Sequence, residues 1–246
     1  MKTTTLSRSL DFSREGRSNI YIIAAFLALL AVVAGFSFTY VGPMMRGTFT
    51  TGRTMVHLHG ALYFLWILLF IGQPILVQRG NVKIHRQIGV FGFILAGIMI
   101  VFGAAVAITG VRLNTPTMMV GGLQPKQFLI VPLTDMVLFA TFLSFSLANL
   151  KRSDYHKRLM LMATVALLPA AFGRMMIMLG VNNPAIIILA NEALLLVAIV
   201  HDLITRKKIH PAYIWGGSFM IIVHLVRFPI GASGWWSSIA EWIVGS

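Results

Sequence analysis

The chain has 246 residues, of which 57% are hydrophobic and only 11% are charged, whereas a soluble globular domain is roughly 45–50% apolar and about 25% charged. This composition excludes a soluble two-domain enzyme and a disordered chain, and it indicates a protein of the lipid bilayer. The chain contains no cysteine. Disulfides, thiolate nucleophiles, iron–sulfur clusters and covalent c-type haem are therefore excluded, so any redox or metal chemistry must use His and carboxylates.

Seven long hydrophobic runs follow a polar N-terminal tail, residues 1–18. Each run approaches the roughly 20 helical residues that cross a hydrocarbon core of about 30 Å. Their continuous apolarity differs from the alternation of a membrane β-barrel, so the runs are expected to be helices. We expect an all-α, polytopic fold with a seven-helix transmembrane domain over residues 19–229. The runs cover 19–41, 56–78, 88–110, 128–150, 159–180, 184–204 and 212–229.

The distribution of Lys and Arg predicts the orientation of these helices. The N-terminal tail and the connections on its side hold 14 of these residues, and the opposite loops hold 4. Because cytoplasmic loops carry the positive excess, we expect the N-terminus inside and the C-terminus outside a bacterial inner (cytoplasmic) membrane. The formal charge of +13 then reflects loops that face anionic lipid, and we expect no nucleic-acid partner.

The segment after the seventh run, residues 230–246, has Trp and Ile at helical spacing on one side and Ser and Glu on the other. This pattern is typical of a short helix that lies in the membrane interface with Trp at the level of the headgroups. We expect it to anchor the outer end of the protein. Its apolar side comprises Trp235, Trp236, Ile239, Trp242 and Ile243.

Ionisable residues within the runs are the main functional signal. A charge inside a membrane helix costs about 2.5–3.5 kcal/mol on insertion scales, so such residues usually face the bundle interior. With about 1.5 Å of rise per residue, one residue on each of five helices lies roughly 5–12 Å below the outer surface. We expect one buried polar layer there, composed of His59, Asp135, Arg174, Glu192 and His224.

Two further residues, His57 and Asn191, lie at similar depths. His57 and His59 are two residues apart, so on a regular helix they point about 160° away from each other. We therefore expect only one of these two imidazoles to face the polar layer.

The layer also has a structural interpretation. An ion pair between Asp135 and Arg174 would hold the fourth and fifth runs together. Glu192 would then be protonated, or hydrogen-bonded to Asn191 or to a His, because an isolated carboxylate in a low dielectric becomes neutral.

Two cofactor chemistries fit the outer layer. One is a b-type haem between a His of the second run and a His of the seventh, with an Arg near a propionate. The other is a first-row transition metal such as zinc or non-haem iron, held by His and carboxylate. The haem residues would be His57 or His59 with His224 and Arg174, and the metal residues His59 and His224 with Asp135 or Glu192.

A second polar layer is expected at the cytoplasmic ends of the helices. His85 and His156 lie near the inner surface and would ligate a second haem, which would complete a transmembrane electron path. Asn191 and Asp202 are eleven residues apart and lie within about 20° on one helical face. With His201 they would line a polar relay between the layers. His, Lys and Arg are also ordinary residues at helix ends in the interface.

Several short motifs resemble a group of uncharacterised bacterial multi-pass membrane proteins. The resemblance covers roughly residues 56–216 and implies a multi-pass fold but no activity. More remotely, successive helices with His at their ends are similar to the transmembrane b-type cytochromes, which implies haem b. The chain departs from those cytochromes because Asp135 stands where a haem-ligating His is expected. The motifs are His57-Leu58-His59-Gly60, His85-Arg86-Gln87-Ile88-Gly89, His156-Lys157-Arg158-Leu159-Met160, Arg174 and His210-Pro211-Ala212.

Three functions remain open from the sequence. The leading hypothesis is a membrane redox protein that binds haem b and exchanges electrons with quinone or a small reductant. Its closest competitor is a transporter, a channel or an assembly factor for another membrane protein, in which Asp135, Arg174 and Glu192 form a gate or a proton relay. The third is a metal-dependent hydrolase or oxygenase that acts on a lipid.

Overall fold

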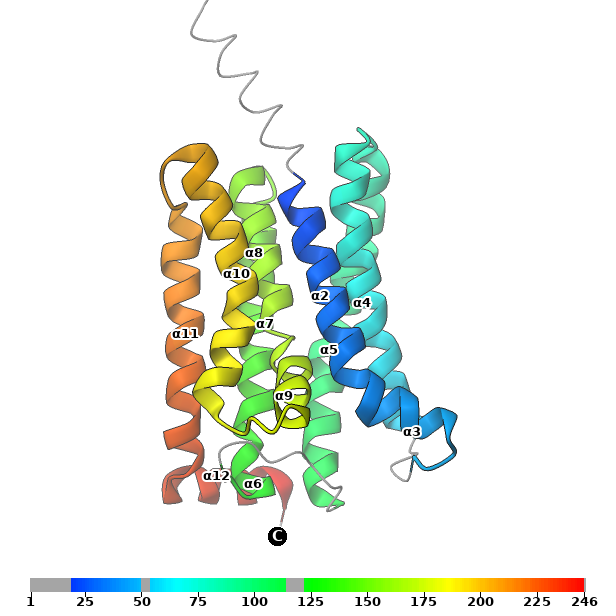
Figure 1. The fold of residues 1–246 in the computed structure, drawn as a ribbon, viewed down its shortest axis with the longest axis vertical. Coiled ribbons are helices and arrows are strands. Elements are labelled where there is room, and N and C mark those ends of the chain that lie inside the picture. Colours follow the sequence, from blue (N-terminus) through cyan, green and yellow to red (C-terminus); the bar gives the residue numbers. More distant parts are fainter. Residues whose placement is uncertain (1–18, 50–53, 114–121, 246) are drawn as a thin grey trace, which may run out of the picture.

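The computed structural model describes residues 19–49, 54–113 and 122–245, and the only regular secondary structure in these residues is helical. The long helices run along one axis of a bundle (Figure 1). The expected all-α fold class is confirmed. The elements are α2 (Ile20–Phe36), the π-helix η1 (Ser37–Val41), α3 (Gly42–Met45), α4 (Thr54–Gln78), α5 (Val82–Arg112), α6 (Pro125–Phe128), α7 (Ile130–Ala148), α8 (Ser153–Val165), α9 (Pro169–Met178), α10 (Pro184–Arg206), α11 (Pro211–Gly231) and α12 (Gly234–Val244).

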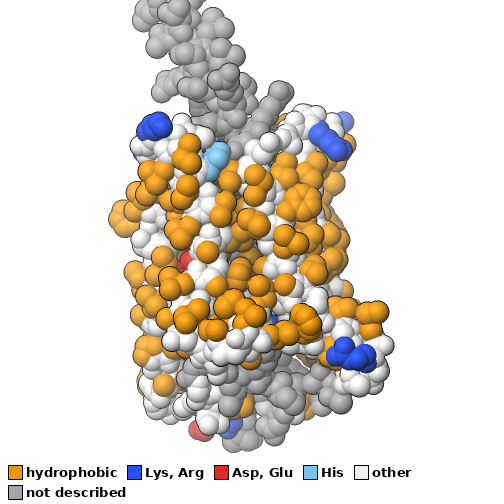
Figure 2. Space-filling view, in the orientation of Figure 1, with side chains coloured by type: hydrophobic (Ala, Val, Ile, Leu, Met, Phe, Trp, Pro, Cys, Tyr) orange, Lys and Arg blue, Asp and Glu red, His pale blue; other side chains and the backbone are white. Residues whose placement is uncertain are grey.

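Among the described residues, six helical segments are long and apolar enough to cross a bilayer, or seven if the bent pair α8 and α9 is one span. Hydrophobic side chains cover the visible flank of the bundle, whereas Lys and Arg lie toward its ends (Figure 2). A wide apolar belt with charged ends is the surface expected of a protein whose solvent is lipid. The structure therefore has the multi-pass character that the hydropathy pattern predicts.

The fifth span differs from its prediction as one helix over residues 159–180. It begins earlier, at Ser153, and is broken after Val165, so that α8 and α9 meet at an angle of 43°. Pro169 is the first residue of α9. Proline has no amide hydrogen and disfavours helical geometry in the residue before it, so the helical ladder of α8 cannot continue through this point.

The bend lets α9 pack closely against the first span. A side-chain carbon on Gly35 of α2 would collide with the backbone of Ala171 in α9. Small residues permit such close approach of two membrane helices. The same contact sets Arg174 of α9 over the ring of Phe36, with 4.5 Å from the guanidinium carbon to the ring centroid.

The two ends of the bundle differ in charge, as the sequence predicts. The end where α4, α7 and α10 finish carries ten described Lys and Arg residues, and the opposite end carries three. This asymmetry favours a cytoplasmic location for the first end. The ten are Arg79, Lys83, Arg86, Lys151, Arg152, Lys157, Arg158, Arg206, Lys207 and Lys208, and the three are Arg46, Arg112 and Lys126.

The C-terminal helix α12 packs against the protein as well as facing outward. Trp236 is buried and its indole N–H donates to the carbonyl of Gln127 at 3.1 Å, while Arg112 of α5 donates to the last carbonyls of α12. The other two tryptophans of α12, Trp235 and Trp242, are exposed. The expected single apolar side is therefore divided: one part closes the outer end of α5 and α6, and the exposed tryptophans are available to the interface.

Candidate functional site

A buried ion pair joins α7 and α11 in the outer half of the bundle. The Nη1 of Arg227 donates to Oδ1 of Asp135 at 2.5 Å, and the two residues are only 3% and 6% exposed. Arg227 lies three residues after His224, so both side chains project from the same face of α11. The ion pair consequently lies beside the imidazole of His224.

The His224 side chain is fully buried and lies between two carboxyl groups from different helices. Its Nδ1 is 2.8 Å from Oε1 of Glu192 in α10, and its Nε2 is 3.8 Å from Oδ1 of Asp135 in α7. The first distance is a hydrogen bond and the second is too long for one. The imidazole thus connects a hydrogen-bonded carboxyl group to a carboxylate that Arg227 neutralises.

Several polar atoms of this network are buried without a hydrogen-bond partner among the described residues. They are Oε2 of Glu192, Nε2 of His224, Oδ1 of Asn191 and Nε of Arg227. The amide of Asn191 donates weakly to Glu192 at 3.4 Å, as one sequence alternative predicted for this carboxyl group. A buried polar atom without a partner costs about 1–3 kcal/mol. Several such atoms together distinguish this network as a candidate functional site.

The structure pairs the charges differently from the sequence analysis. The partner of Asp135 is Arg227, which the sequence analysis did not select, and not Arg174. Arg227 lies within one turn of the expected end of its span, a place where Arg is ordinarily interfacial. The available signal was its spacing of three residues from His224, which places both on one helical face.

The two histidines of α4 diverge, as their spacing predicts. Nδ1 of His57 is 2.5 Å from the hydroxyl of Tyr40, outside the His224 network. The ring of His59 instead packs against the ring of Tyr63, with 4.2 Å between the two ring centroids. Tyr63 donates to the carbonyl of Met99 at 3.1 Å. His59 therefore faces the bundle, whereas His57 binds the outer end of the first span.

Of the expected metal residues, His224 lies beside both Asp135 and Glu192, but the three are not arranged around one point. No group of three or more His, Asp or Glu side chains in the described parts of the chain is placed to hold one metal ion. The geometry explains this, since the imidazole of His224 lies between Asp135 and Glu192 and keeps their oxygens apart. His59 lies on α4 rather than on α7, α10 or α11, and its electrostatic neighbour is Arg174 of α9.

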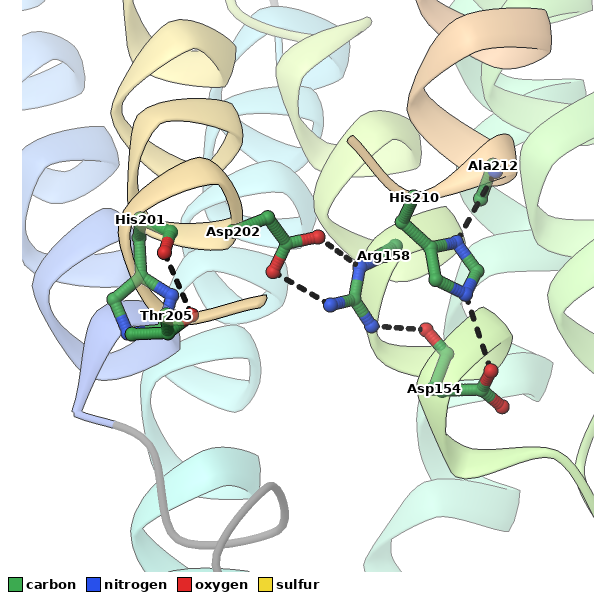
Figure 3. Close-up of polar contacts among 7 residues, drawn as sticks. All are labelled: Asp154, Arg158, His201, Asp202, Thr205, His210 and Ala212. Carbon is green, nitrogen blue, oxygen red and sulfur yellow. Dashed lines mark hydrogen bonds and ion pairs between the residues drawn. The ribbon is translucent and has the colours of Figure 1, made fainter. Parts of the chain in front are cut away.

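A second buried network ties α8, α10 and the start of α11 at the other end of the bundle (Figure 3). Arg158, 2% exposed, donates from Nε and Nη2 to the two carboxylate oxygens of Asp202 at 2.9 and 2.6 Å. Its Nη1 donates to the backbone carbonyl of Asp154 at 2.7 Å. A two-pronged Arg–carboxylate contact is strong and directional. The predicted relay residue Asp202 is therefore held by an ion pair.

His210 connects the start of α11 to the same network. Its Nδ1 accepts from the amide of Ala212 at 3.1 Å, and its Nε2 lies 3.1 Å from Oδ2 of Asp154. Because Nδ1 accepts, the ring proton is on Nε2 and donates to Asp154. Burial lowers the pKa of His210 below its usual 6.5, although the contact with Asp154 opposes the shift. The neutral imidazole thus caps α11.

The remaining predicted histidines lie at this inner end. Nδ1 of His156 is 2.7 Å from the hydroxyl of Ser146 and 3.2 Å from its carbonyl. His85 of α5 is close enough to His156 for their charges to interact. The backbone carbonyl of His201 accepts from the hydroxyl of Thr205 (Figure 3). His85 and His156 therefore lie at the same end of the bundle and within electrostatic range of each other. His201 is one residue away from Asp202 of the Arg158 ion pair.

An apolar layer separates the two networks. Glu192 and Asp202 are ten residues apart on α10, which is about 15 Å of helix. The buried side chains between them on α10 include Leu195 and Ala198, and Met220 of α11 is fully buried as well. A proton therefore meets no continuous chain of polar side chains along α10 in this conformation.

The comparisons with known proteins do not assign a family. No protein-family model matches the chain, and neither a curated protein nor a solved structure matches it significantly. The fold and these two networks define it as a polytopic helical membrane protein with buried ionisable residues. The resemblance to multi-pass bacterial proteins and to b-type cytochromes stays a prediction.

A mutant cycle tests the ion pair between α7 and α11. Removing one partner leaves a buried charge unpaired, so we expect Asp135→Asn or Arg227→Gln alone to lower the free energy of unfolding by about 3–5 kcal/mol. The double variant should recover part of that loss because neither charge remains. Reversible unfolding of the purified protein in mixed micelles measures the cycle.

The exposed pair Lys126 and Glu241, 3.8 Å apart, is the matched control. Removing Glu241 should change stability by less than about 1 kcal/mol because solvent screens this pair. Strictly additive losses at Asp135 and Arg227 would contradict the proposed coupling.

The His210 contact predicts a dependence of stability on pH. Since the folded state lowers the pKa of His210 from 6.5, it binds this proton less readily than the unfolded chain. The contribution of His210 is complete above pH 6.5 and declines as the pH falls below it. Thermal unfolding measured from pH 5 to pH 8 should show a decline that His210→Asn removes. An unchanged pH profile in this variant would refute the assignment.

Proposed function

We propose that this protein is a gated proton carrier and that Glu192 and His224 hold the transported proton between them. The observation that carries the proposal is the fully buried imidazole, which is hydrogen-bonded to a carboxyl group on α10 and faces a second carboxylate on α7. Ionisable groups inside a membrane protein that contact one another are typical of proton pathways. This is the transporter alternative of the sequence analysis in a specific form.

The charge arrangement suits the movement of a proton with little cost in net charge. Asp135 and Arg227 cancel each other, so a proton shared by Glu192 and His224 can reside on either group. With protons on both Nδ1 and Nε2, His224 is an imidazolium beside two carboxylates. When the Nδ1 proton has moved to Oε1, His224 and Glu192 are both neutral.

One proton can pass through His224 to Glu192 in two steps. A proton enters at Nε2 of His224, which has no hydrogen-bond partner among the described residues. The proton on Nδ1 then passes to Oε1 of Glu192, and the electron pair of that N–H bond stays on the ring. The result is one proton gained at Nε2 and one delivered to Glu192. The carboxylate of Asp135 stabilises the intermediate imidazolium.

The apolar layer supports a carrier rather than an open channel. Leu195, Ala198 and Met220 lie between Glu192 and the inner network and supply no polar atom from their side chains. The ion pair of Arg158 and Asp202 also closes the inner end. Passage of the proton then requires rearrangement of packed helices, which occurs on microseconds to milliseconds or more slowly.

Proton flux into liposomes tests this function. Purified protein is reconstituted with a pH-sensitive dye inside, and a potassium diffusion potential drives protons inward. We expect uptake above that of protein-free liposomes, and a decrease of at least about tenfold in Glu192→Gln and His224→Gln, since each variant removes one proton-binding group.

Glu241→Gln is the matched control, because Glu241 is an exposed carboxylate that contacts Lys126 at the outer end. It should keep the uptake of the unaltered protein. Uptake equal to that of empty liposomes, or equal uptake by His224→Gln and the unaltered protein, would overturn the proposal.

A second candidate, a b-type haem protein, is favoured by the geometry of His156. Its Nδ1 is bonded to Ser146, which leaves Nε2 as the ligating atom. A ligating His typically has its other nitrogen bonded in this way. His85 is its electrostatic neighbour. When bound, haem would supply one-electron chemistry at the inner end.

An absorption spectrum of the detergent-purified protein tests this candidate. We expect a Soret band that disappears in His85→Ala and in His156→Ala. His57→Ala should retain it, because His57 binds Tyr40 in the outer part of the protein. A protein purified from haem-replete cells without a Soret band would exclude this candidate and leave the proton carrier untouched.

A further inference from the structure

Arg174 is a cation within the bundle that none of the described carboxylates neutralises. Five carboxylates belong to the described residues, and each has a cationic or imidazole partner. Arg174, in the outer half of α9, has no carboxylate partner among them. The pairs are Asp135 with Arg227, Asp154 with His210, Glu192 with His224, Asp202 with Arg158 and Glu241 with Lys126.

The surroundings of Arg174 satisfy only part of its guanidinium. Nη1 donates to the carbonyl of Ala170, one turn earlier on α9, at 2.9 Å. The guanidinium carbon lies 4.5 Å from the centroid of Phe36. A guanidinium has five N–H donors and is always charged. These two contacts use only one of the N–H donors. The other donors and the positive charge of Arg174 have no carboxylate partner among the described residues.

A second unsatisfied polar group lies close by. Nδ1 of His59 is buried and has no hydrogen-bond partner among the described residues. His59 is near enough to Arg174 for the two charges to interact. Its ring is positioned against Tyr63. The helices that carry them, α4 and α9, both pack against α2, so the imidazole and the guanidinium project from two neighbours of one helix.

The two residues also lie in the same half of the bundle. Arg174 is four residues from the end of α9, and His59 is five residues from the start of α4. Both of these helix ends lie in the half of the bundle away from the Lys- and Arg-rich end (Figure 1).

We propose that Arg174 and His59 form a binding site for a carboxylate or phosphate group. Arg binds such groups through paired N–H donors, and the neutral imidazole adds one donor or acceptor. The group can belong to an anionic lipid in the outer leaflet or to a soluble anion. The site does not depend on the proton pathway, because Arg174 and His59 belong to neither of the two ion-pair networks.

Ligand-induced thermal stabilisation tests the site with the full chain in neutral detergent. The probes are phosphatidylglycerol, phosphatidylcholine and inorganic phosphate, each titrated separately, because a ligand that binds only the folded state raises the unfolding temperature. We expect an anionic probe to stabilise the protein and Arg174→Gln to weaken its apparent affinity at least about tenfold, the loss expected for charged hydrogen bonds. His59→Ala should weaken it less.

Arg46→Gln is the matched control, since Arg46 is an exposed arginine at the same end. It should bind the probes as the unaltered protein does. Stabilisation by phosphatidylglycerol alone identifies a lipid headgroup, and stabilisation by inorganic phosphate identifies a soluble anion. Equal stabilisation of Arg174→Gln and the unaltered protein, or none by any anionic probe, overturns the site. If Arg174→Gln does not fold, Arg174→Lys and His59→Ala provide the same comparison.

Discussion

A charge inside the hydrocarbon layer must be compensated by the protein itself, because the acyl chains of the lipid provide neither hydrogen bonds nor counter-ions. This requirement organises the interior of the bundle. Asp135 and Arg227 join α7 to α11, and Arg158 and Asp202 join α8 to α10. Each pair specifies which two helices are neighbours. Apolar packing alone allows many arrangements of similar helices, so these ion pairs supply information that hydrophobic contact does not.

Buried ion pairs are poor sources of net stability, since the cost of desolvation offsets much of their attraction. Their retention is more readily explained by chemistry. The outer network combines one neutralised pair with a His–carboxyl couple and several unpartnered atoms. The inner network has its main contacts formed, with the Arg158 guanidinium bonded on three of its donors. The unpartnered atoms of the outer network are consistent with the proposed proton exchange, whereas the inner network joins helices.

Arg174 shows how a local break can create a site. Pro169 ends the path of α8, and the 43° bend brings α9 against α2. Gly35 provides the space for that contact. Arg174 is thereby carried away from the acidic residues of the bundle and toward Phe36. A straight fifth span would direct this cation elsewhere, so the unpaired charge is a consequence of the broken helix.

The sequence by itself determined the all-α fold class, the apolar length of the spans and most of the outer polar layer, but not the break within the fifth span. Asp135, Glu192, Asn191 and His224 were recognisable because ionisable or amide groups are rare in apolar runs. Only the tertiary structure decided their partners. Hydropathy gives the depth of a residue but not the rotation of its helix or the identity of neighbouring helices, so it could not choose Arg227 over Arg174 for Asp135. That choice depends on the packing of α7 against α11, which arises from contacts distant in sequence, and on the bend before α9, where Pro169 interrupts the helix.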